Sequence, residues 1–238
     1  MTTPLLSIVN LSVPKKGRAE PLLDKVTLFV EKGERVALVG LNGSGKTTLL
    51  GSIAGLFRHE GEIRVEGELL TSKSAATIRG KLGYLFNVPE DQLLFPRVLD
   101  DVAYGLIRGK VPLARAHEKA LEVLKTLGIE QLAHCTVHNL SHGQKQRVAL
   151  AGALITGAPL LLLDEPSAAL DPVAKMQLAK VLRGITHAGI LCATNDLEFA
   201  RAFCHRYIFI EAGKVVPELV DEAAILARWG LSDGRSPV

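Results

Sequence analysis

The chain has 238 residues, a formal net charge of +3 at pH 7 and three cysteines. The length suffices for one large α/β domain or a domain with a subdomain, and the mild charge argues against a nucleic-acid partner. The odd cysteine count, without a Cys-x-x-Cys pair, favours buried free thiols in a reducing compartment over a disulfide framework. A hydrophobic fraction of 47% is high for a soluble monomer and favours an extensive protein interface.

The N-terminus carries no secretory signal pattern, because residues 1–6 lack a charged stretch and a long apolar run. The longest mostly apolar stretch, residues 151–163, is interrupted by Thr156, Gly157 and Pro159 and is too short to cross a bilayer. We therefore expect a cytoplasmic protein.

The first third of the chain mixes two kinds of predicted strand. Residues 5–9 and 26–30 alternate apolar and polar side chains, which predicts an antiparallel β portion, and residues 63–65 are expected to join it. Residues 35–39 instead form a short apolar run, typical of a buried strand. A glycine-rich loop follows this run directly, and residues 48–53 then continue as a helix.

The glycine-rich loop fits the pattern Gly-x-x-x-x-Gly-Lys-Thr over residues 40–47 and has the strand–loop–helix context that a phosphate-binding loop needs. Its glycines allow backbone N–H groups to point at a polyphosphate, Lys46 would reach the β- and γ-phosphates, and Thr47 would offer a hydroxyl to Mg²⁺. The cofactor-binding residues predicted here are Asn42, Gly43, Ser44, Gly45, Lys46, Thr47 and Thr48.

The remaining elements indicate an open α/β sheet. Residues 112–127 show a helical stripe that Gly128 is expected to end. Residues 159–163 and 190–194 are continuous apolar runs, as in parallel strands covered on both faces, and residues 207–214 predict a late hairpin. A last helix over residues 221–231 places its apolar residues on one face; it would dock on the chain's own core or, alternatively, on a partner or membrane surface.

Two adjacent carboxylates, Asp164 and Glu165, end the apolar run that begins at Leu160. The carboxyl ends of strands in open α/β sheets are where ligands bind. We expect Asp164 to hold the Mg²⁺ shell, and Glu165, which faces a different direction, to accept a proton from the water that attacks the γ-phosphate.

Between the loop and the acids lies Leu140-Ser141-His142-Gly143-Gln144, and here the chain resembles the ABC-transporter ATPase family, whose signature is L-S-G-G-Q. The resemblance implies an α/β P-loop NTPase fold with a RecA-like parallel sheet core, an N-terminal antiparallel β portion and a helical signature subdomain. It also implies that Mg²⁺ and ATP are the cofactors, and that Ser141, Gly143 and Gln144 face the ATP bound to the other subunit of a head-to-tail dimer. Asp171 would span the interface in the segment that resembles the family's D-loop.

The resemblance divides the chain into three parts. Residues 1–86 and 157–216 would form the ATP-binding core with its antiparallel β portion, and residues 87–156 the helical subdomain. Residues 217–238 would form a C-terminal helical tail.

A subfamily resemblance lies in residues 86–96, which are similar to the F-Q-N-P-D-D-Q-L-F pattern of energy-coupling-factor ATPases. That group takes up cobalt, nickel or vitamins such as biotin. There, a homo- or heterodimer of ATPases works at the cytoplasmic face of the membrane with a transmembrane coupling protein and a substrate-binding membrane protein. Glu90 and Asp91 are candidates to meet arginines on the coupling protein, unless they form a solvated acidic turn.

Some positions depart from the family pattern. Asn87 stands where the family has the glutamine that links Mg²⁺ and the attacking water to the transporter, and Gln92 is too far along to replace it. Asn195 stands in place of the switch histidine and can donate a hydrogen bond but cannot carry a proton. Without an aromatic residue before Phe29, Val13 or Pro14 would have to contact adenine.

These departures leave a second hypothesis open, a catalytically weak, nucleotide-gated subunit that pairs with an intact ATPase. A zinc or nickel site is a further alternative, because histidines and a cysteine recur at about four-residue intervals between His134 and His142.

Overall fold

The computed structural model describes residues 3–15, 17, 20–217 and 222–230. Its strands are β1 (Leu6–Val13), β2 (Leu23–Val30), β3 (Arg35–Val39), β4 (Glu60–Val65), β5 (Glu68–Leu69), β6 (Leu82–Leu85), β7 (Leu160–Asp164), β8 (Gly189–Thr194), β9 (Arg206–Glu211) and β10 (Lys214–Val215). Its α-helices are α1 (Lys46–Ile53), α2 (Ala75–Gly80), α3 (Val98–Arg108), α4 (Leu113–Thr126), α5 (His142–Leu154), α6 (Pro172–Gly184), α7 (Leu197–Phe203) and α8 (Glu222–Arg228). Short 3₁₀ helices are η1 (Pro89–Asp91), η2 (Glu130–Leu132) and η3 (Val137–Asn139).

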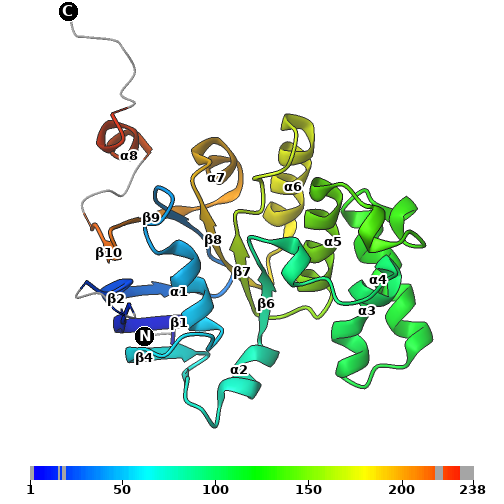
Figure 1. Ribbon diagram of the computed structural model, residues 1–238, viewed down its shortest axis with the longest axis horizontal. Coiled ribbons are helices and arrows are strands. Elements are labelled where there is room, and N and C mark those ends of the chain that lie inside the picture. The colour runs from blue at the N-terminus through cyan, green and yellow to red at the C-terminus, as the bar shows by residue number, and fades with distance from the viewer. Residues whose placement is uncertain (1–2, 16, 18–19, 218–221, 231–238) are drawn as a thin grey trace, which may run out of the picture.

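The described strands form two sheets, shown in Figure 1. One is antiparallel, with the order β2-β1-β4-β5, and the other has the order β10-β9-β3-β8-β7-β6. In the second sheet the neighbouring strands from β9 through β3, β8 and β7 to β6 pair in parallel. Among the described strands of this sheet, β10 alone runs antiparallel to its neighbour, β9. The predicted α/β class, the N-terminal antiparallel portion and the late hairpin are thereby confirmed.

Side chains alternate between the two faces of the parallel sheet and so enter two apolar clusters. Leu160 and Leu162 of β7 pack with the antiparallel sheet and α1, while Leu161 and Leu163 face the other way. That second face packs against α5, α6 and α7, and the same cluster continues through α3 and α4, which lie on the right of Figure 1. Every residue of β7 and β8 is buried, which explains their uninterrupted apolar sequences.

Strand β1 ends at Val13, four residues beyond its predicted end at Val9. The prediction stops early because a bulge interrupts the alternation of buried and exposed side chains. Asn10 has a φ of 52°, and the pairing register with β2 shifts between Ile8 and Leu11. The bulge returns Leu11 and Val13 to the buried face, so a simple period of two fails at this point.

The predicted C-terminal helix docks on the chain's own core, as the first of its two alternatives states. Ile225 of α8 is fully buried, and Trp229 lies with its ring centroid 6.2 Å from that of Phe209. Arg228 donates to a carboxylate oxygen of Glu211 at 2.6 Å. Residues 221 and 231, the predicted ends of this helix, lie outside the described residues, as do residues 218–220 and 232–238 of the predicted tail.

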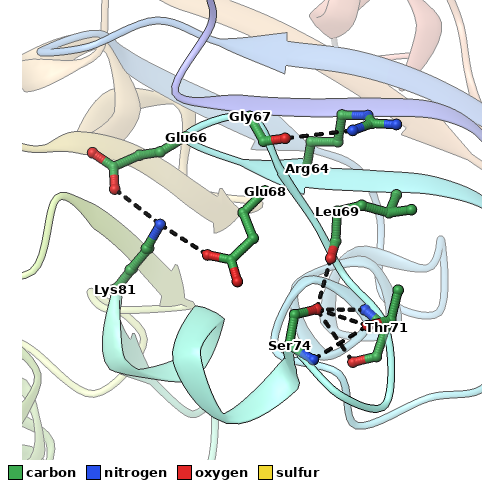
Figure 2. Close-up of polar contacts among 8 residues, drawn as sticks. All are labelled: Arg64, Glu66, Gly67, Glu68, Leu69, Thr71, Ser74 and Lys81. Atoms are coloured by element: carbon green, nitrogen blue, oxygen red, sulfur yellow. Dashed lines mark hydrogen bonds and ion pairs between the residues drawn. The ribbon is translucent and has the colours of Figure 1, made fainter.

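Polar contacts join the β4–β5 hairpin to the segment that leads into the parallel sheet (Figure 2). The Lys81 ammonium lies 3.4 Å from Glu66 and 3.1 Å from Glu68, and the hydrogen bond to Glu68 is the main reason that the pKa of Lys81 is raised. Ser74, just before α2, donates its hydroxyl to the Leu69 carbonyl at 2.6 Å. These contacts hold the antiparallel sheet beside the start of β6.

Candidate nucleotide-binding site

The loop between β3 and α1 depends on glycine at specific points. A Cβ on Gly40 would lie 2.3 Å from the Ile210 carbonyl oxygen, and one on Gly45 would lie 2.8 Å from Leu23. Gly45, with a φ of 110°, is the N-cap of α1 and has no side chain with which to cap it. The N-terminus of α1 therefore presents backbone donors and the positive end of its dipole to the loop, which suits a phosphate group.

Lys46, the first residue of α1, is only 6% exposed and its ammonium lies inside the loop. It donates to the Gly40 carbonyl at 2.7 Å and lies 3.3 Å from Oε1 of Glu165. Lys46 of the loop and Glu165, which directly follows β7, are predicted from separate parts of the sequence and form an ion pair.

Asp164 ends β7 with a side chain that is almost completely buried. Burial raises the pKa of this carboxyl to about 6; the Thr47 hydroxyl and Lys46 oppose the shift, while Glu165 adds to it. Although Thr47 lies close, neither oxygen of Asp164 has a hydrogen-bond partner of good geometry among the described residues. A buried carboxylate without a donor, next to a threonine hydroxyl, is a suitable ligand pair for a hard divalent cation.

Glu165 turns away from the direction of β7 because its backbone is left-handed, with a φ of 49°. Its N–H donates to the Ala193 carbonyl at 2.9 Å, and the backbone N–H of Asn195 donates to Oε2 at 3.4 Å. The carboxylate thus lies between Lys46 and Asn195. The Asn195 amide in turn donates to Oδ1 of Asn42 at 3.5 Å, so the predicted residues of the loop, β7 and β8 meet at one edge of the parallel sheet.

Asn87 does not join this cluster. It is exposed beyond the end of β6, and within the described residues no hydrogen bond or ion pair connects it to Thr47 or Asp164. Gln92 is engaged elsewhere: its carboxamide accepts from the Phe86 N–H and donates to the Ala149 carbonyl, both at 3.0 Å. Gln92 therefore fixes the loop after β6 to α5.

The signature segment begins α5 as expected. Ser141 is the N-cap, its hydroxyl accepts from the Gln144 N–H at 3.3 Å, and the Gln144 side chain accepts from the Ser141 N–H at 2.8 Å. A Cβ on Gly143 would lie 2.8 Å from the Ala169 carbonyl oxygen, so glycine here permits close approach to the segment before α6. Asp171 caps α6 by accepting from the Ala174 N–H at 2.9 Å.

Gln146 is a residue that the sequence analysis did not identify. It is 2% exposed, its amide donates to the Glu165 carbonyl at 3.4 Å, and its own oxygen has no partner in the described part of the chain. The signature helix is thereby linked to the backbone of Glu165. A glutamine on the buried face of a helix, among Val148, Ala149 and Leu150, is the sequence signal for this role.

One expectation about contacts to adenine needs correction, and one alternative can be compared with the structure. Val13 cannot present its side chain to adenine, because this last residue of β1 is 2% exposed and its side chain lies in the core. Pro14, in contrast, is exposed. The described residues contain no group of three or more His, Cys, Asp or Glu side chains placed to hold a metal, so the zinc or nickel site is not formed.

Glu90 is not a freely solvated acid. Lys145 of α5 lies 3.0 Å from its carboxylate and is the main reason that the pKa of Glu90 is lowered, and His142 lies 3.6 Å away. Asp91 beside it is exposed.

None of the helices in the described ranges has both the length and the hydropathy to span a bilayer.

Comparison with known proteins agrees with the resemblance to the ABC-transporter ATPase family. The profile of the ABC transporter family matches residues 23–168. A putative ABC transporter ATP-binding protein of Methanosarcina mazei is 34% identical over 220 residues, which cover 90% of this chain and 66% of that protein, so the chain spans about two thirds of its length. The energy-coupling factor transporter ATP-binding protein EcfA1 of Geobacillus kaustophilus is 34% identical over 92% of this chain and 79% of that protein.

Among solved structures, the chain resembles the dimeric structure of MJ0796, described as a bacterial ABC transporter cassette. The TM-score is 0.82 with 30% identity, covering 91% of this chain and 97% of the other. MJ0796 has also been solved in a post-hydrolysis state bound to ADP and Pi.

Proposed function

Since this chain belongs to the ABC transporter ATP-binding family, we propose that it is the ATPase subunit of an energy-coupling-factor type importer that takes up a micronutrient. The chain is an ABC-type ATPase, and the energy-coupling-factor relatives support the narrower assignment. Cobalt, nickel and a vitamin such as biotin are the cargo classes proposed, with selection made by a membrane partner. Its place would be peripheral, at the cytoplasmic face of the membrane.

The observation that carries the ATPase part of the proposal is the meeting of Lys46, Asp164, Glu165 and Asn195 at one sheet edge. Lys46 would bind the β- and γ-phosphates of ATP, helped by the backbone of residues 42–48. Thr47 and Asp164 would hold Mg²⁺, which the unpartnered oxygens of Asp164 favour. When bound, the metal would neutralise charge on the phosphates.

Glu165 would take a proton from the attacking water through its carboxylate, and Asn195 would donate a hydrogen bond to the γ-phosphate. Because Lys46 contacts both the Gly40 carbonyl and Glu165, binding of a phosphate by Lys46 would compete with those contacts. Asn87, which is exposed, is proposed to reach the metal and water only if the loop after β6 moves inward.

Ser141, Gly143, Gln144 and Asp171 are proposed to act across a head-to-tail dimer. Within the described chain no hydrogen bond or ion pair joins them to Lys46, and the dimeric structure of MJ0796 supports an arrangement in which a second subunit supplies them. We further propose that residues 1–86 and 157–216 act as the ATP-binding core, residues 87–156 as the helical subdomain and 217–238 as the tail, although apolar packing is continuous between α5 and β7.

ATP-dependent association tests the proposed site. In the Glu165→Gln variant, sedimentation should show monomers without nucleotide and dimers with Mg-ATP, because much of the interface is the nucleotide itself. Lys46→Ala added to this variant should abolish the ATP-induced dimer. A stable dimer that ATP does not affect would contradict the geometry.

The membrane partners are proposed to be a transmembrane coupling protein and a substrate-binding protein. Asp91 remains exposed for such a contact, whereas Glu90 is already paired with Lys145. Charge reversal at both acids should release the membrane subunits in co-purification and leave nucleotide affinity unchanged. Co-purification at the parent ratio would refute this contact.

The second candidate is a catalytically weak subunit that pairs with an intact ATPase, and the asparagines at 87 and 195 favour it. Steady-state ATP hydrolysis distinguishes the two. Turnover by the chain and its membrane partners, without any other ATPase, would support the importer ATPase. Turnover that needs a second, different ATPase would support the catalytically weak subunit.

A further inference from the structure

A cavity of about 660 Å³ lies between the C-terminal end of α4, one side each of α5 and α6, and the start of β7. Its apolar lining includes Leu127, Leu154, Leu161, Leu178 and Val181. The volume falls within the range of small-molecule sites, and none of the candidate nucleotide-binding residues lines it.

The charged side chains that line the cavity are all basic. Lys125, Arg147 and Lys180 contribute to the wall, together with His187, and no aspartate or glutamate does so. Apolar walls with several cations and no carboxylate are complementary to an anion that carries an apolar body.

Arg147 is the residue that makes this complementarity specific. Its Nε is shielded from solvent and has no hydrogen-bond partner, and no ion pair joins its guanidinium to a carboxylate in the described ranges. The Nε itself is out of reach of a molecule in the cavity, but Arg147 lines the cavity, and a carboxylate there would pair with the charge of its guanidinium.

We propose that this cavity binds a single-chain amphipathic carboxylate, with the carboxylate on Arg147 and the alkyl chain along Leu154, Leu161 and Val181. The concave apolar wall suits an alkyl chain, and the basic residues and absence of acids in the lining disfavour a cationic head group. An inorganic anion alone would leave the apolar lining exposed to water.

Dodecanoate below its micelle concentration is the probe, titrated by calorimetry into the nucleotide-free chain. We expect saturable binding, no binding of dodecyltrimethylammonium, and a loss of affinity of about tenfold or more in Arg147→Met, which keeps the apolar stem but removes the donors. Arg115→Met, which removes an exposed cation on α4 outside the cavity, is the matched control and should bind as the parent does.

Val181→Trp, which should obstruct the part of the cavity beside Val181, is the second variant, and melting temperatures establish that each variant is folded. The proposal is overturned if no dodecanoate binds the parent, if the cationic and anionic probes bind equally, or if Arg147→Met and Arg115→Met lower affinity alike. It is also overturned if the parent self-associates and Val181→Trp abolishes that association, because the occupant would then be a second copy of the chain.

Discussion

Replacement of Asp164 by asparagine should change how the stability of the metal-free, nucleotide-free chain depends on pH. In the folded chain Asp164 ionises at about 6, against an ordinary value of 3.8, because burial disfavours its charged form. Between pH 3.8 and about pH 6 the unfolded chain binds fewer protons at Asp164 than the folded chain does. The contribution of Asp164 to stability therefore falls as pH rises through this range.

The magnitude follows from the difference of the two pKa values, which corresponds to about 3 kcal/mol when each unit is about 1.36 kcal/mol. The free energy of unfolding of Asp164→Asn, relative to the parent, should therefore increase by most of that amount between about pH 4 and about pH 7. Any constant cost of the buried amide does not affect this pH-dependent difference.

Urea unfolding in EDTA at several pH values measures the effect, with Glu118→Gln on the exposed face of α4 as the control for loss of one negative charge. A difference between variant and parent that does not vary with pH, or that varies equally in Glu118→Gln, would refute the assignment of Asp164 as a buried, weakly solvated carboxyl. The same variant should also bind Mg-ATP more weakly.

Further predictions concern catalysis and packing. Glu165→Gln should lower ATP turnover about 10²-fold or more and retain Mg-ATP binding; parent-like hydrolysis would show that Glu165 is not the base. Asn195→His should raise turnover and Asn195→Ala should lower it, with affinity little changed; an alanine variant as fast as the parent would exclude position 195 from catalysis. Gly143→Ala should lower the melting temperature because its Cβ would lie 2.8 Å from a carbonyl oxygen, whereas Gly152→Ala in the same helix meets no atom within 4 Å and should raise it.

The sequence predicts the parts of the site that are determined locally. The Lys46 loop is a contiguous pattern between a strand and a helix, and Asp164 and Glu165 directly follow an apolar strand. Such segments fold in the same way wherever the strand lies, so their local structure can be inferred without knowledge of the sheet order. The N-cap role of Ser141 is local for the same reason.

Contacts across the fold could not be predicted in this way. The Lys46–Glu165 pair depends on the order of the strands, because β8 lies between β3 and β7. Similarly, Lys145 reaches Glu90 only because η1 packs beside α5, and the order of residue types along the chain gives no measure of that proximity. Bulges such as that at Asn10 add a further uncertainty, since one extra residue reverses the faces of a strand.

Glu165 illustrates how these long-range contacts stabilise an unfavourable local structure. A left-handed backbone at a residue other than glycine costs about 1–3 kcal/mol and persists only where its surroundings determine it. Here the carbonyl accepts from Gln146 of the signature helix, while the carboxylate contacts Lys46 of the loop and the N–H of Asn195. Because each contact comes from a different element, displacement of α5, of the loop or of the segment after β8 would alter the position of the same carboxylate. Nucleotide contact at any of these elements can therefore change the geometry of the proposed base.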